Sequence, residues 1–162
     1  METTYGVGAR DKRASLKYMI AEVAIANGIN PRAFLRMAEI ESDFDPDSFH
    51  HQSKAAGLFQ FIPSTAKQFQ LENPFDPAAS AKAAAKLWNE NRKILQAGLG
   101  RVPTDGEVYL AHQQGAYGAI RLLLHSDQLA SSLVGRKAVL QNGGRETMTA
   151  REFAELWTKR FD

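Results

Sequence analysis

Apolar residues recur at the spacing of an α-helix along almost the whole chain, and Gly and Pro fall between the periodic segments. Only AAGLFQFI, residues 55–62, has the composition of a strand. The pattern predicts a mainly α fold with a small β element near residues 55–62. A chain of 162 residues, 44% of them hydrophobic, is the usual size of one domain with a full core, so we expect a single domain over residues 1–162.

Local signals place several helix boundaries. We expect a first helix over about residues 11–27, and Asn30 should cap a second helix that begins at Pro31. Further helices are predicted at residues 63–69, at residues 77–97, after the capping box Thr104–Glu107 and after the capping box Thr149–Glu152.

The charge balance and the lack of cysteine argue against several classes of protein. The 20 Lys and Arg against 18 Asp and Glu fall far short of the positive stripe that a nucleic-acid backbone requires. Without cysteine there is no disulfide framework and no thiolate chemistry. The N-terminal METTYGVGARDKR has no apolar signal-peptide region, and no apolar run is long enough to span a membrane. We therefore expect a monomer made in the cytoplasm, without nucleic-acid binding or stable membrane insertion.

Five carboxylates lie within MAEIESDFDPDSF, residues 37–49. The second predicted helix carries a stripe spaced i, i+3, i+4 and i+7, formed by Phe34, Met37, Ala38 and Glu41. Glu41 is therefore expected on the buried face, where desolvation and the negative end of the helix dipole both disfavour the anion. This environment suits a general acid, although a glutamate at a helix end can instead extend to water. Asp43, Asp45 and Asp47 lie beyond the expected helix end and should be solvated.

A metal site is not expected in this segment. DFDPDSFHHQSK, residues 43–54, begins like a calcium loop, but Pro46 lies inside it, the sixth position is not Gly, and Lys54 stands where a bidentate Glu would bind. His50 and His51 are adjacent and do not easily face one ion together. We expect neither a metal nor a cofactor.

Two blocks of sequence resemble the lytic transglycosylase family related to goose-type lysozyme. That family shows E-S-x-F-x-P, then G-L-M-Q or G-L-F-Q followed by x-x-P-x-T-A. The eleven matching positions are Glu41, Ser42, Phe44, Pro46, Gly57, Leu58, Phe59, Gln60, Pro63, Thr65 and Ala66. Two further blocks, FDPAASAKAAAKLW and LAHQQGAYGA, extend the resemblance over roughly residues 14–124.

The chain departs from the family pattern in the last two blocks and in one loop. The changes in the two blocks are Ser80 for Asn, Ala84 for Gly, His112 for Tyr and Gln113 for Asn. The family's loop serine, which positions substrate and carboxylate, is replaced by His51, with Ser53 two positions later. Either the loop shifts by two residues or this serine's role is lost.

The resemblance implies a lysozyme-like α-helical fold and a substrate, the glycan strands of peptidoglycan. It implies cleavage of the β-1,4 bond between N-acetylmuramic acid and N-acetylglucosamine, with closure to a 1,6-anhydromuramic acid end. Glu41 resembles the family's single general acid and base. The residues expected to contact the saccharide are Ser53, Phe59, Gln60, His112, Gln113 and Tyr117. Residues 125–162 match no motif.

Two alternatives stay open on the sequence. A hydrolase of the lysozyme type would use Glu41 together with Asp43, Asp45 or Asp47 to activate water. A non-catalytic peptidoglycan-binding module of a virion or secretion assembly would explain the changed block LAHQQGAYGA. The small size, the missing signal peptide and the G-L-F-Q variant suggest a bacteriophage-type enzyme, an antimicrobial endolysin or a virion-associated protein that acts on the cell wall.

Overall fold

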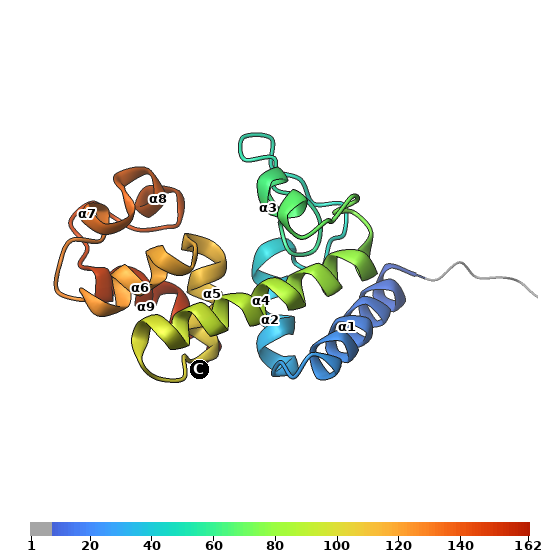
Figure 1. Cartoon of the computed structure of the whole chain (residues 1–162). Helices are drawn as coiled ribbons and strands as arrows, with labels where there is room; N and C mark the ends of the chain where they lie inside the picture. Colours follow the sequence, from blue (N-terminus) through green and yellow to red (C-terminus); the bar gives the residue numbers. More distant parts are fainter. Residues whose placement is uncertain (1–7) are drawn as a thin grey trace, which may run out of the picture. The chain divides into compact units, whose positions relative to one another are not determined.

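The computed structural model describes residues 8–162, and that part of the chain is mainly α-helical (Figure 1). Its helices are α1 (Ala9–Ala26), α2 (Pro31–Ser42), α3 (Pro63–Gln68), α4 (Pro77–Leu99), α5 (Asp105–Gln114), α6 (Ala116–Leu124), α7 (Ala130–Val134), α8 (Arg136–Gln141), α9 (Ala150–Thr158) and the 3-10 helix η1 (Lys159–Phe161). The predicted fold class is confirmed. None of the helices within residues 8–162 is long and apolar enough to cross a membrane.

Contacts within the chain divide it into two compact units, Met1–Lys86 and Leu87–Asp162. In the first unit α1 packs against α2 (Figure 1). The side chains that this packing buries include Ile20 and Ala24 of α1 and Phe34 and Met37 of α2. The boundary between the units falls inside α4. The single domain expected over residues 1–162 stays a prediction.

The start and the end of α2 follow from its sequence. The side chain of Asn30 accepts a hydrogen bond from the Arg32 N–H at 3.1 Å, and Pro31 occupies the first helical position, as predicted. The helix ends at Ser42 because Asp43, with a φ of 51°, adopts the left-handed conformation at the C-cap. The last turn of α2 therefore presents Glu41 next to a sharp change of chain direction.

The predicted β element consists of isolated bridges. Phe49 pairs with Ala56, and Ala56 pairs with Phe61, both antiparallel. Ala56 and Phe61 exchange both backbone N–H···O bonds at 3.0 Å, which closes a turn over residues 57–60. Neither pairing extends into a named strand within the described residues, because the chain turns again on both sides of Ala56.

In the second unit α5 packs against α6, α9 and η1. Both predicted capping boxes are present: Thr104 with Glu107 begins α5, and Thr149 with Glu152 begins α9. Phe153 of α9 is fully buried, and the Trp157 indole N–H donates to the carbonyl of Asn142 at 2.9 Å. Part of the C-terminal segment that matched no motif therefore contributes to the core of this unit.

Three helices, α6, α7 and α8, were not predicted from the sequence. Gly115 at a φ of 77° separates α5 from α6, and Gly135 at a φ of 92° separates α7 from α8. With five and six residues, α7 and α8 are too short to show a helical period of their own.

Candidate active site

Glu41 is the next-to-last residue of α2 and is half-buried. Phe34, Met37 and Ala38, which share its face, are buried, so the helical phase predicted for this stripe is confirmed. The position combines partial desolvation with the negative end of the helix dipole. The last turn of α2 therefore holds the Glu41 carboxyl between the buried face of the helix and its surface.

Two contacts attach the end of α2 to the turn over residues 57–60. The hydroxyl of Ser42 donates to the carbonyl of Leu58 at 2.9 Å. The ring of Phe34 stacks on that of Phe59, with centroids 4.9 Å apart and planes inclined by 27°. Glu41 and this turn are thus held together within one unit. Sequence reasoning gave Ser42 no role, although a hydroxyl directly after the proposed acid was visible in the motif.

The turn itself requires glycine at its first position. Gly57 has a φ of 82°, and a Cβ atom there would lie 1.9 Å from the carbonyl oxygen of Pro74. Any larger residue would push the segment before α4 away from the turn. Glycine therefore fixes both the shape of the turn and its close approach to Pro74.

Gln60, the last residue of the turn, adopts a φ of 52° and is half-buried. Its side-chain amide donates to the carbonyl of Gly57 at 2.9 Å and to that of Ser48 at 3.2 Å. Because both partners are acceptors, they fix which end of the amide carries nitrogen. The amide oxygen is buried and has no hydrogen-bond partner among the described residues. Because this oxygen is buried, a ligand donor such as a sugar hydroxyl could reach it only after the turn moved.

Phe59 is buried in the core, whereas Ser53 lies at the surface. Phe59 has no exposed surface, so a contact between its ring and a saccharide would require the core to open. Ser53 is exposed in the loop between Phe49 and Ala56, where its hydroxyl oxygen accepts a hydrogen bond from the N–H of Ala55 at 3.2 Å. His51 is also exposed, with its ring edge-on to Phe49 at 5.1 Å.

The three aspartates that follow α2 are exposed, as predicted. Arg13 donates to the carboxylate of Asp43 at 2.7 Å and to its carbonyl at 2.9 Å. The hydrogen bond and the charge of Arg13 hold the pKa of Asp43 below its ordinary value. Asp45 accepts a hydrogen bond from the N–H of Asp47 at 2.9 Å, which closes a local turn. Asp43 is therefore a poor proton acceptor, and Asp45 is engaged in shaping the loop.

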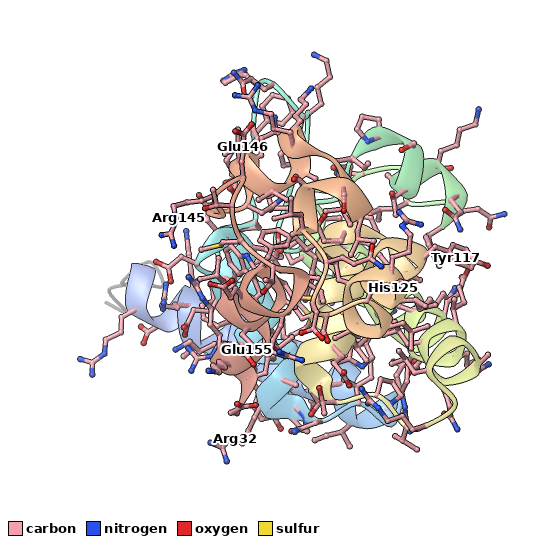
Figure 2. The ribbon with its side chains drawn as sticks, turned by 90° about the vertical axis from the view of Figure 1, so that its left-hand side faces the viewer. Arg32, Tyr117, His125, Arg145, Glu146 and Glu155 are labelled. Atoms are coloured by element: carbon pink, nitrogen blue, oxygen red, sulfur yellow. The ribbon has the colours of Figure 1, made fainter. Side chains whose placement is uncertain are left out.

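The remaining predicted residues lie in the second unit. The ring of His112 on α5 faces that of Tyr109, with centroids 6.1 Å apart, and the amide oxygen of Gln113 accepts from the Gln114 amide at 3.0 Å. Tyr117, on the first turn of α6, is 69% exposed and projects from the helix (Figure 2). The ring of Phe161 also stacks on that of Tyr109, with centroids 4.9 Å apart.

Within residues 8–162, no group of three or more His, Asp and Glu side chains could hold a metal ion.

Comparison with protein families places most of this chain in one of them. Residues 18–122, more than half of the sequence, match the family model described as the transglycosylase SLT domain. The match includes α2, the turn over residues 57–60, α5 and most of α6. The helices α7, α8 and α9 lie beyond it.

Proposed function

Because the chain belongs to the transglycosylase SLT domain family, whose members are lytic transglycosylases, we propose that Glu41 is its single catalytic acid and base. The chain is an enzyme that cleaves peptidoglycan glycan strands by a lyase-type reaction. The proposal concerns which residue moves the proton and which bond breaks.

In the proposed reaction Glu41 protonates the oxygen of the β-1,4 bond between N-acetylmuramic acid and N-acetylglucosamine, and the bond from that oxygen to C1 breaks. An oxocarbenium-like or oxazolinium species forms at C1 with help from the acetamido group of the muramic acid. The Glu41 carboxylate then takes the proton from the C6 hydroxyl, whose oxygen bonds to C1. The product ends in 1,6-anhydromuramic acid, no water is consumed, and Glu41 is protonated again.

One observation carries this proposal: the half-buried Glu41 is joined, through Ser42, to the turn that carries the bare amide oxygen of Gln60. A positioned carboxyl can act as a general acid, and the turn bonded to the end of α2 carries a polar amide that could meet a substrate hydroxyl once exposed. These two groups supply what a single-acid mechanism needs in this unit.

Two of the three aspartates, Asp43 and Asp45, support the single-acid mechanism over hydrolysis. A lysozyme-type hydrolase needs a second carboxylate to activate water. Asp43 is paired with Arg13 and its pKa is lowered, and Asp45 closes a turn with Asp47. Closure by the C6 hydroxyl needs no such base, because the substrate itself holds that hydroxyl near C1 at high effective concentration.

We further propose saccharide contacts in each unit by itself, by Ser53 and Gln60 in the first unit and by His112, Gln113 and Tyr117 in the second. The exposed ring of Tyr117 offers a flat apolar face to a sugar, and the half-buried Gln113 offers an amide. A saccharide contact by Phe59 would need a conformation in which its ring is exposed. The monomeric state and the bacteriophage, endolysin and antimicrobial setting stay predictions from the sequence.

Mass analysis of the products in water enriched in oxygen-18 tests the mechanism. Purified sacculi should yield chains that end in 1,6-anhydromuramic acid, without new reducing ends and without the label. Reducible muramic acid ends that carry the label would identify a hydrolase and overturn the proposal. Release of nothing from any sacculus would support the binding-module alternative.

A further inference from the structure

A pocket of about 740 Å³ lies in the first unit, on residues that the proposed reaction does not use. Its lining is Lys54, Phe61, Pro63, Ala66, Lys67, Gln70, Leu71, Glu72 and Pro74. The volume is within the range of pockets that hold small organic ligands. Neither Glu41 nor Gln60 belongs to the lining, but Phe61 directly follows Gln60 in the chain.

The lining combines an apolar surface with fixed charges. Phe61, Ala66 and Leu71 are buried side chains that line the pocket with hydrocarbon. Lys54 and Lys67 are exposed, and no ion pair joins either one to another residue of the described chain. Glu72 is the one acidic residue of the lining. The pocket therefore presents two positive charges and one negative charge around an apolar centre.

The backbone holds two of the polar lining residues in an unusual conformation. Lys54 has a φ of 60° and Gln70 a φ of 55°, in the left-handed region that residues with a side chain rarely adopt. At Lys54 this conformation accompanies a backbone hydrogen bond of 2.7 Å from its N–H to the carbonyl of His50. This backbone conformation fixes the direction of the Lys54 side chain in the loop between Phe49 and Ala56.

We propose that this pocket binds the peptide stem carried by the muramic acid of the substrate, an inference that rests on the proposed function. A stem peptide is short and carries carboxylates, small methyl side chains and the amine of a diamino acid. Lys54 and Lys67 match the carboxylates, the apolar lining matches the methyl groups, and Glu72 matches the amine. The sugars themselves carry no comparable set of charges.

The place of the pocket in the chain fits a stem that branches from the glycan strand. Gln60, proposed to contact the strand, is one residue from Phe61, and consecutive Cα atoms are about 3.8 Å apart. The backbone of the turn that carries Gln60 therefore continues directly into the lining of the pocket. The pocket would select glycan that still bears its stems over glycan that has lost them.

Kinetics on two substrates test this selection. We expect the wild-type protein to cleave stem-bearing glycan chains with a higher kcat/KM than chains from which an amidase has removed the stems. The double variant Lys54→Gln, Lys67→Gln should lower kcat/KM about threefold to tenfold on stem-bearing chains, the size expected for losing two exposed charged contacts, and leave stem-free chains unchanged. The double variant Lys82→Gln, Lys86→Gln is the matched control, because both lysines are exposed on α4 outside the pocket. Loss of these two charges should leave kcat/KM unchanged on both substrates.

Titration of a free stem tetrapeptide gives a readout that does not depend on cleavage. NMR signals of the methyl groups of Ala66 and Leu71 should shift in the wild type, and the shift should be lost in the lysine double variant. Equal kinetics on both substrates without methyl shifts would overturn the pocket assignment and leave the proposed reaction intact. Methyl shifts without any cleavage would remove the proposed reaction and leave a peptide-binding pocket.

Discussion

Replacing Gly57 by alanine is expected to separate the turn over residues 57–60 from the segment before α4. The added Cβ would lie 1.9 Å from the carbonyl oxygen of Pro74 and 2.9 Å from its carbonyl carbon, whereas ordinary contacts begin near 3.4 Å. Both atoms belong to the backbone, so no side-chain rotation relieves the overlap. The turn or the Pro74 segment has to move.

The expected loss of unfolding free energy in Gly57→Ala follows from a comparison with Gly28→Ala. Gly28 also has a positive φ, 69°, but a Cβ there meets nothing within 4 Å. Both variants carry the conformational penalty of a left-handed alanine, about 1–2 kcal/mol, and the same gain from a stiffer unfolded chain. The difference between them is therefore the overlap alone, for which overpacked sites suggest about 1–3 kcal/mol.

Urea unfolding of the three proteins measures this difference. Gly57→Ala should lose about 1–3 kcal/mol more unfolding free energy than Gly28→Ala, or roughly 2–12 °C of Tm for a chain of this length. The folded part of the Gly57→Ala population should also cleave more slowly, because the carbonyl of Gly57 accepts the Gln60 amide. Equal losses for both variants would refute the close approach of Gly57 to Pro74.

Two further predictions concern carboxylates. Glu41→Gln should lower kcat on sacculi by at least two to four orders of magnitude while the Tm stays near that of the wild type, and near-normal turnover would exclude Glu41 as the acid. Burial alone would raise the pKa of Glu107, but hydrogen bonds from Arg101 and from Thr104 outweigh it and hold the pKa below the ordinary 4.5. The charged form of Glu107 is thus stabilised in the folded state. Thermal scans should therefore show the wild-type Tm falling as the pH drops below about 4.5. The fall should be less steep for Glu107→Gln, which keeps an amide in the capping box. Parallel pH profiles would contradict this contribution of Glu107.

Features encoded by neighbouring residues could be predicted from the sequence. The Asn30 cap, the Pro31 start and both capping boxes each depend on a few consecutive positions, and the structure contains all four. The buried stripe that includes Glu41 was predictable for the same reason, because a helix of twelve residues shows its period clearly.

Features set by distant residues could not be predicted in this way. The helices α7 and α8 are held by tertiary contacts with each other and with their neighbours, and their own sequences are too short to specify them. The pocket is lined by Lys54 and Phe61 together with residues from Pro63 to Pro74, so it depends on how these segments pack. The bare oxygen of Gln60 likewise depends on two carbonyls, from Ser48 and Gly57, that fix the amide from the other end.

The adjacent residues Glu41 and Ser42 have different roles: Glu41 is the proposed acid, and Ser42 attaches α2 to the turn over residues 57–60. Consecutive residues of an α-helix point about 100° apart, so the two side chains of this pair leave α2 in different directions. The hydroxyl of Ser42 shares its one proton between the carbonyl of Leu58 at 2.9 Å and that of Ala38 at 3.2 Å. The carboxyl of Glu41 keeps a separate direction on the stripe with Phe34. A movement of the turn that carries Gln60 must therefore break a hydrogen bond at the residue next to the proposed acid, which couples the position of the turn to that of Glu41.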